Sequence, residues 1–127
     1  MSIPDPYEFS RHWLAAWNAH DLEALLEHFD DDVVFTSPVA AQLLDDSDGV
    51  IRGKTALRAY WTEGLRRIPD LHFDLVGVYT GVNSIVINYR NDKGGLVNEV
   101  LHFHHGLVHH GHGTYLGTGD NLAGASR

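Results

Sequence analysis

The sequence contains no cysteine and few basic residues, and each scarcity excludes a class of function. Without cysteine the chain cannot form a disulfide, a thiolate nucleophile or a cysteine metal site. Nine Lys and Arg stand against seventeen Asp and Glu, a formal net charge of -8. The basic residues are scattered, whereas binding to phosphates needs a concentrated positive surface. We therefore expect no nucleic-acid partner.

Long apolar runs are also missing. No segment approaches the length that crosses a bilayer, and the first residues lack the basic start and apolar stretch of a secretion signal. We expect a cytoplasmic protein that does not contact a membrane. The 127 residues, 43% of them hydrophobic, suit one domain, which we place at residues 1–117. The small and polar residues 118–127 are expected to form a flexible tail.

Helical signals dominate the first half of the chain. Asp5 followed by proline marks the start of a first helix, Asp21 can cap a second and shorter one, and a third is predicted from about Thr55 to Ile68. Residues 33–37 alternate as a short strand that ends at a proline. Residues 39–49 are expected to be irregular.

From residue 71 onward the hydrophobic period changes to two. Four strands are predicted, joined by short Gly, Asn and Asp turns, so consecutive strands should be antiparallel neighbours. Their expected ranges are 71–79, 82–90, 96–104 and 107–116. Helices followed by a meander of strands are typical of an α+β fold in which the helices cover one face of a curved sheet.

Two of these strands, 82–90 and 96–104, carry apolar residues on both faces. A monomer with helices on one side of its sheet does not need the second apolar face. We therefore expect a homodimer that forms through the outer face of the sheet.

The last predicted hairpin suggests a pair of ionisable groups. A two-residue loop at His105 and Gly106 places Glu99 opposite His112, whereas a shift of two residues would make His110 the partner. A slip of one residue would turn these histidines to the other face. A carboxyl and an imidazole that share an apolar wall can exchange a proton near neutral pH. Glu99 and His112 are thus the predicted catalytic residues, with a structural role as the alternative for Glu99.

Six of the ten histidines lie between His102 and His112, which raises the question of a metal site. In the predicted register these histidines are divided between the two faces of the sheet, so we expect no bound metal. Other residues are expected to contact a ligand because of their place on inward-facing stripes and strands. They are Trp13, Trp17, Phe35, Ser37, Tyr60, Trp61, Asn88, Leu101 and His110, with a dimer contact as the alternative for Asn88.

Several local strings resemble the nuclear transport factor 2-like superfamily, which includes ketosteroid isomerase, scytalone dehydratase and SnoaL-type polyketide cyclases. They are WNAHDL at 17–22, FDDDVVFTSP at 29–38, IRG at 51–53 and EVLHF at 99–103. The resemblance implies a cone: a curved, mostly antiparallel sheet wrapped around about three N-terminal helices, with an interior pocket. The family includes enzymes, binding proteins and dimerisation modules, so the likeness specifies fold better than chemistry.

Comparison with the isomerase branch places its tyrosine at Trp13, its general-base aspartate at Ser37 and its hydrogen-bonding acid at Glu99. Only Glu99 retains an acid, so that isomerase reaction is not expected. In the dehydratase and cyclase branches, His and Asp side chains inside the cone move protons. The resemblance therefore implies a small-molecule pocket protein, with cofactor-free acid/base catalysis of the isomerase, dehydratase or cyclase type on a mostly apolar molecule. A non-catalytic binding protein or a dimerisation module of the same fold is the alternative.

Overall fold

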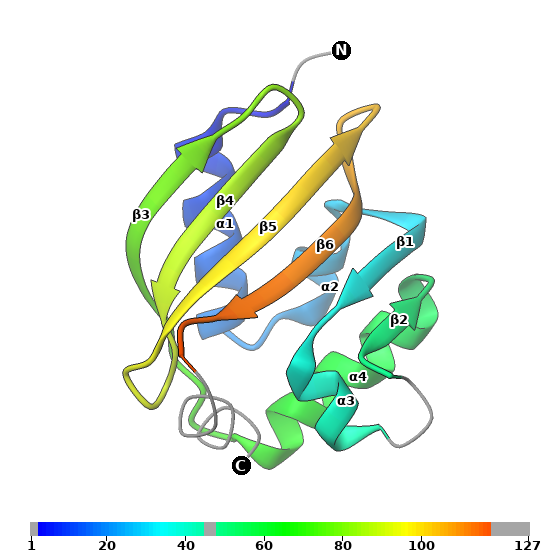
Figure 1. Ribbon diagram of the computed structural model, residues 1–127, viewed down its shortest axis with the longest axis vertical. Helices are drawn as coiled ribbons and strands as arrows, with labels where there is room; N and C mark the ends of the chain where they lie inside the picture. Colours follow the sequence, from blue (N-terminus) through cyan, green and yellow to red (C-terminus); the bar gives the residue numbers. More distant parts are fainter. Residues whose placement is uncertain (1–2, 45–47, 118–127) are drawn as a thin grey trace.

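The computed structural model describes residues 3–44 and 48–117, which form one curved sheet with helices on one side (Figure 1). The predicted tail at 118–127 lies outside the described residues. The helices are α1 (Pro6–Asn18), α2 (Leu22–Leu26), α3 (Pro38–Leu43) and α4 (Lys54–Arg67). The strands are β1 (Phe29–Thr36), β2 (Val50–Arg52), β3 (Asp74–Thr80), β4 (Ser84–Arg90), β5 (Leu96–His104) and β6 (Leu107–Tyr115).

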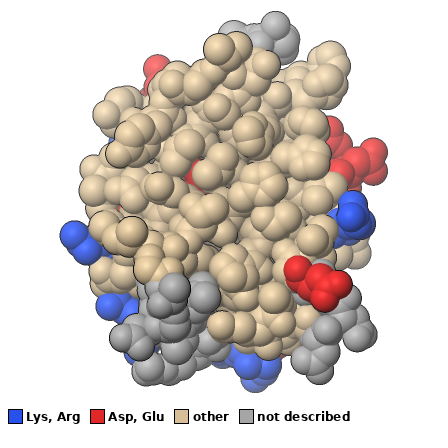
Figure 2. Space-filling model, viewed as in Figure 1, with Lys and Arg blue, Asp and Glu red and all other residues tan. Residues whose placement is uncertain are grey.

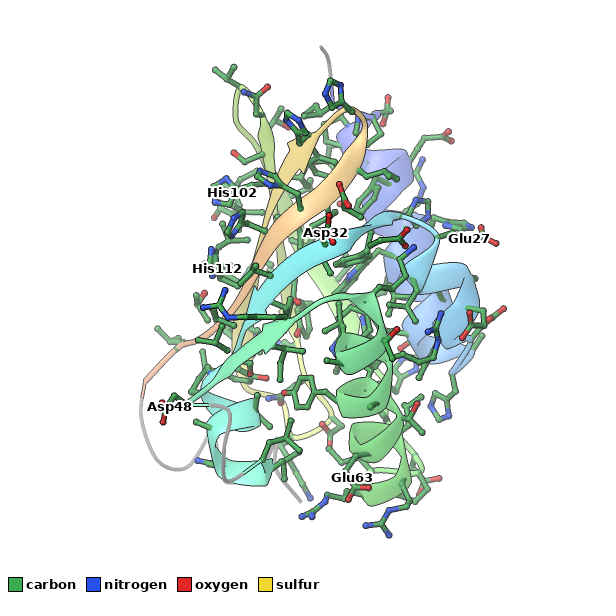
Figure 3. The ribbon with its side chains drawn as sticks, turned by 90° about the vertical axis from the view of Figure 1, so that its right-hand side faces the viewer. Glu27, Asp32, Asp48, Glu63, His102 and His112 are labelled. Carbon is green, nitrogen blue, oxygen red and sulfur yellow. The ribbon has the colours of Figure 1, made fainter. Side chains whose placement is uncertain are left out.

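The six strands follow the order β2-β1-β6-β5-β4-β3. Every neighbouring pair is antiparallel except β1 and β6, which are parallel. Helices α1, α2 and α4 lie on the same side of the sheet, as Figure 3 shows from the edge. The predicted α+β architecture, with a curved sheet around N-terminal helices, is confirmed. Among the described residues, no helix has both the length and the apolar character needed to span a membrane.

The helix boundaries follow from side-chain caps. The Asp5 carboxylate accepts a hydrogen bond from the amide of Glu8 at 3.0 Å, and the Asp21 carboxylate accepts one from the amide of Ala24 at 3.1 Å. Each bond satisfies an amide that has no partner inside its own helix. These two caps lie at the positions predicted from the sequence.

One short helix lies mostly within the segment 39–49 that was expected to be irregular, and a short strand that was not predicted follows this segment. Helix α3 begins after Ser37, whose hydroxyl accepts the amide of Val39 at 3.1 Å. Strand β2 then pairs with β1, which itself begins at Phe29 rather than Val33. Neither α3 nor β2 is long enough to show a hydrophobic period, so packing rather than pattern determines them.

The core fills the space between the helices and the inner face of the sheet. It is unusually aromatic: Trp13 stacks on Phe73 with ring centroids 6.1 Å apart, and Trp17 contacts Trp61 edge-on at 5.1 Å. Aromatic pairs in such offset and edge-on arrangements stabilise a core beyond the area that they bury. The contact between Trp17 and Trp61 links α1 to the middle of α4.

The β5–β6 hairpin turns at His105 and Gly106, as predicted, and both residues have positive φ angles of 52° and 81°. Phe103 pairs with Val108, also as predicted. Between His102 and Phe103, however, the register shifts by one residue through a β-bulge. Beyond the bulge, Glu99 lies opposite Gly113 and not His112, so the predicted pairing of the acid with a histidine is wrong.

The physical reason for the shift lies on the inner side of β6. A Cβ atom at Gly111 would lie 2.9 Å from Cδ1 of Phe35 and 3.3 Å from Cδ2 of Leu101. There is no room for a histidine at this position, and burying an imidazole against these apolar groups would also cost desolvation energy. The bulge therefore places glycine on the crowded inner face and the histidines on the outer face.

We predict that Gly111→Ala lowers the free energy of unfolding by about 1–3 kcal/mol, because the added methyl group overpacks the core against Phe35. Gly77→Ala on β3 is the matched control, since a Cβ there meets nothing within 4 Å. Urea denaturation measures both. Equal stability of the two variants would contradict the close approach at Gly111.

Candidate functional site

A cavity of about 80 Å³ lies between the helices and the sheet. Its wall comes from α1, α3, α4, β1, β4, β5, β6 and the loops that follow α4 and β4. The lining residues are Trp13, Trp17, Phe35, Ser37, Val39, Leu43, Tyr60, Trp61, Gly64, Ile68, Leu71, Phe73, Tyr89, Asn91, Asp92, Glu99, Gly113 and Tyr115. This volume is small beside the roughly 300–1,000 Å³ of typical ligand pockets, so it favours a small ligand.

Glu99 is the acidic group deepest in this wall. It lies on β5 between Ile87 of β4 and Gly113 of β6, and it is only 5% exposed. The hydroxyl of Tyr89 donates a hydrogen bond to its Oε1 atom at 3.2 Å. Burial raises the pKa of Glu99 to about 8, because desolvation disfavours the carboxylate more than the Tyr89 hydrogen bond favours it. At neutral pH Glu99 is therefore mostly a neutral acid that can donate a proton.

A chain of hydroxyl groups adjoins the acid. The Tyr60 hydroxyl donates to Oγ of Ser37 at 3.4 Å, and Ser37 also hydrogen-bonds Tyr115. Burial raises the pKa of Tyr60 to about 12 and raises that of Tyr115 further. Both phenols thus stay neutral over the physiological range, and they act as hydrogen-bond donors and acceptors rather than as bases.

Two indole groups in the wall have unused donors. Nε1 of Trp13 and Nε1 of Trp17 are buried and have no hydrogen-bond partner within the described chain. A buried donor without an acceptor costs free energy, so such a group needs a physical reason. Both tryptophans line the cavity, where an oxygen of a ligand is a suitable acceptor.

Six of the nine residues predicted to contact a ligand belong to the cavity wall. They are Trp13, Trp17, Phe35, Ser37, Tyr60 and Trp61. The other three do not line it. Leu101 is fully buried in the core beside Gly111, whereas Asn88 and His110 lie on the outer face of the sheet.

His112 is likewise on the outer face, opposite Val100. Figure 3 shows His112 and His102 on the side of the sheet away from the helices. The Nδ1 atom of His112 lies 2.7 Å from the hydroxyl oxygen of Thr36, and His112 does not line the cavity. Within the described residues no three His, Asp or Glu side chains converge on a point that could hold a metal ion.

Eleven cavity residues were not among the predicted site residues, and the polar ones are Tyr89, Asn91, Asp92 and Tyr115. The register predicted for the last hairpin would place Tyr115 on the outer face, but the observed shift turns it inward. Asn91 and Asp92 follow β4 in a segment that the sequence marks only as a turn. An acidic residue next to a strand end is a weak signal, because most such residues are solvated.

A match to a family model shows which protein family the chain belongs to. The SnoaL-like domain model matches residues 10–114, nearly the whole described chain. The chain belongs to the SnoaL-like family. No curated protein is significantly similar to it.

Solved structures agree with this assignment. A SnoaL-like protein of unknown function from Burkholderia thailandensis is 42% identical, with a TM-score of 0.83 over 89% of this chain and all of that one. Bal32a, from a soil-derived mobile gene cassette, is 22% identical with a TM-score of 0.74 over 94% and 92% of the two chains. IdmH of Streptomyces antibioticus, proposed to be a polyketide cyclase, is 16% identical with a TM-score of 0.70 over 89% and 93%. The last two show the SnoaL-like fold alone.

We predict that Glu99→Gln gains stability relative to the unsubstituted protein as the pH rises. The folded pKa of about 8 exceeds the ordinary value of 4.5, so the unfolded chain releases this proton first. Ionisation of the unfolded chain therefore destabilises the native protein between about pH 4.5 and 8, and the loss is constant above that range. Gln cannot ionise, so the stability difference should grow by several kcal/mol across this window.

Urea denaturation at a series of pH values measures this difference. Glu27→Gln, at an exposed position beyond α2, is the control and should show no comparable pH-dependent gain. A Glu99→Gln curve parallel to that of the unsubstituted protein at every pH would contradict a buried neutral acid.

Proposed function

We propose that this SnoaL-like protein carries out cofactor-free acid/base chemistry on a small, mostly apolar organic molecule held in the cavity. Glu99 supports this proposal more than any other residue, since it is a buried carboxyl at the wall of an aromatic cavity. General acids are commonly tuned in this way, by burial that raises the pKa of a carboxyl toward the working pH.

The surrounding groups favour a substrate that carries an oxygen. The unpaired indole donors of Trp13 and Trp17 and the neutral hydroxyls of Tyr60 and Tyr115 all offer hydrogen bonds. The protonated carboxyl of Glu99 adds a donor that can transfer its proton. Together these groups would stabilise negative charge that develops on a carbonyl or hydroxyl oxygen during isomerisation, dehydration or ring closure.

The second candidate is a binding protein of the same fold. The small volume of the cavity and the dominance of aromatic rings in its wall favour this alternative, because a site without turnover needs only shape and a few donors. The two candidates differ in whether a proton moves. An exchange assay therefore separates them, and it does not require that the natural substrate be known.

We predict that the protein catalyses deuterium exchange at the α-carbon of a small ketone. Cyclohexanone, a small and mostly apolar ketone, is the probe, and proton NMR in D₂O follows the exchange. Glu99→Gln should lower the rate about 10²- to 10⁴-fold, the usual contribution of a general acid or base. Glu27→Gln should leave it unchanged.

Binding is measured separately through tryptophan fluorescence, since all three tryptophans of the chain line the cavity. Saturable quenching by the ketone without exchange would show a binding protein. If this ketone and smaller ones cause neither quenching nor exchange, the pocket is rejected as the functional site.

We further propose that the protein forms a homodimer through the outer face of the sheet. Lys, Arg, Asp and Glu lie mainly around the rim of this face and leave its centre almost uncharged (Figure 2). Val86 of β4 pairs with Val100 of β5 there, next to the exposed His102 and the partly exposed His112. For a chain of net charge -8, this is a surface that a second copy can approach without facing like charges.

We predict that Val100→Glu converts the dimer to a monomer, because two-fold symmetry would bring the new carboxylates of both copies into one desolvated interface. Val82→Glu is the matched control, at a residue that is 90% exposed in the β3–β4 turn. Sedimentation velocity gives the mass of each form. A monomeric unsubstituted protein at tens of micromolar would reject the interface.

A further inference from the structure

The cavity holds a second carboxyl group whose role the proposed function does not assign. Asp92 lines the same wall as Glu99, and the lining contains no Lys, Arg or His among the described residues. Acid/base chemistry needs a group that accepts a proton as well as one that donates it. Since His112 lies on the opposite face of the sheet, the cavity must supply the acceptor from its own wall.

Asp92 lies in the turn between β4 and β5, at the end of the molecule where α4 and β6 also terminate (Figure 1). The turn is braced by the side chain of Asn91, whose Oδ1 accepts the amides of Lys93 at 3.0 Å and Gly95 at 2.9 Å. Arg90 adds a hydrogen bond to the carbonyl of Gly94 at 3.0 Å. These hydrogen bonds hold the backbone around Asp92 in a defined conformation. A residue that acts on a bound molecule needs such a fixed position.

The Asp92 carboxylate remains available to a ligand. Over residues 3–44 and 48–117, no other side chain donates a hydrogen bond to it, and only its own backbone amide does so. It is half-buried, so it combines contact with the cavity and access to water. A group in this position can take a proton from a bound molecule and return it.

Tyr115 connects the two acids. All three residues line the same cavity, and the charges of Glu99 and Asp92 both contribute to the raised pKa of the Tyr115 phenol. The environments of the acids differ. Glu99 is enclosed, whereas burial raises the pKa of Asp92 against the opposing effects of its own amide and of Lys93. Two carboxyls in unequal environments can divide the roles of acid and base.

We propose that Asp92 is the proton acceptor of this cavity and that its substrate is an uncharged carbonyl compound with an acidic C–H bond next to the carbonyl. This inference rests on the proposed acid/base function. The absence of basic side chains from the described lining favours an uncharged substrate, because a carboxylate or phosphate would meet two acids and no cation.

The step balances without a cofactor. The carboxylate of Asp92 removes the proton as the C–H bond breaks, and the electron pair of that bond forms a carbon–carbon double bond. The carbonyl π electrons move to the oxygen, which receives the hydrogen bond or proton of Glu99. When Asp92 returns the proton to a different carbon of the conjugated enol and the oxygen gives its proton back to Glu99, the carbonyl reforms and the molecule is isomerised. When Asp92 returns a deuteron acquired from D₂O to the same carbon, the result is hydrogen–deuterium exchange.

We predict that Asp92→Asn lowers the rate of cyclohexanone exchange by about 10²-fold or more, while fluorescence quenching by the ketone persists. Asp92→Glu, which keeps a carboxylate one methylene further along, should retain part of the rate. Asp74→Asn, the same substitution at an exposed residue of β3, is the control and should have no effect. Thermal unfolding confirms that each variant is folded.

The pH profile provides a readout that a structural role would not change. The unsubstituted protein should show a rate that rises with the ionisation of the base and falls above about pH 8, where Glu99 loses its proton. Asp92→Asn should remove the rising limb, and Glu99→Gln should remove the falling one.

The outcomes distinguish the two proposals. Exchange by the unsubstituted protein that Asp92→Asn leaves intact overturns the assignment of Asp92, while the proposed function stands. Binding of the ketone without exchange overturns both. A partial rate in Asp92→Glu together with loss in Asp92→Asn supports a carboxylate base at this position.

Discussion

The absence of side chains at two positions of β6 determines which residues the cavity contains. Phe35 from β1 and Leu101 from β5 occupy the space in front of Gly111, and Glu99 with Ser37 lies in front of Gly113. Because any larger residue would be overpacked at Gly111, the strand must turn its histidines outward. The alternation of side chains then carries the next residue on this face, Tyr115, into the cavity wall.

This arrangement gives Glu99 neutral partners. A carboxyl opposite an imidazolium would be ionised and held in an ion pair, and its pKa would be lowered. Opposite a glycine, the buried carboxyl retains its proton near neutral pH, because desolvation outweighs the hydrogen bond from Tyr89 that favours the carboxylate. The chemistry available to the cavity is therefore that of a neutral acid among phenols and indoles, with Asp92 at its edge as the more exposed carboxyl.

Local signals were sufficient for much of the fold. Helices α1 and α4 and strands β3 to β6 follow from their hydrophobic periods, and the His105–Gly106 turn follows from its residues. The predicted register of the last hairpin is wrong for a physical reason. The turn determines only the first pairs. The bulge between His102 and Phe103 depends on packing against Phe35, which lies on a strand nearly seventy positions earlier in the chain.

The candidate site, like the fold, was only partly predictable from the sequence. The amino-acid order by itself determined the class of fold, the inward stripes with Trp13, Trp17 and Trp61, and the presence of an acid on β5, because these depend on periodicity along one element. Only the tertiary structure decided that Glu99 faces a cavity without histidine and that Asp92 and Tyr115 belong to its wall. Those facts depend on volume shared between strands that are distant in sequence, and no local pattern contains that information.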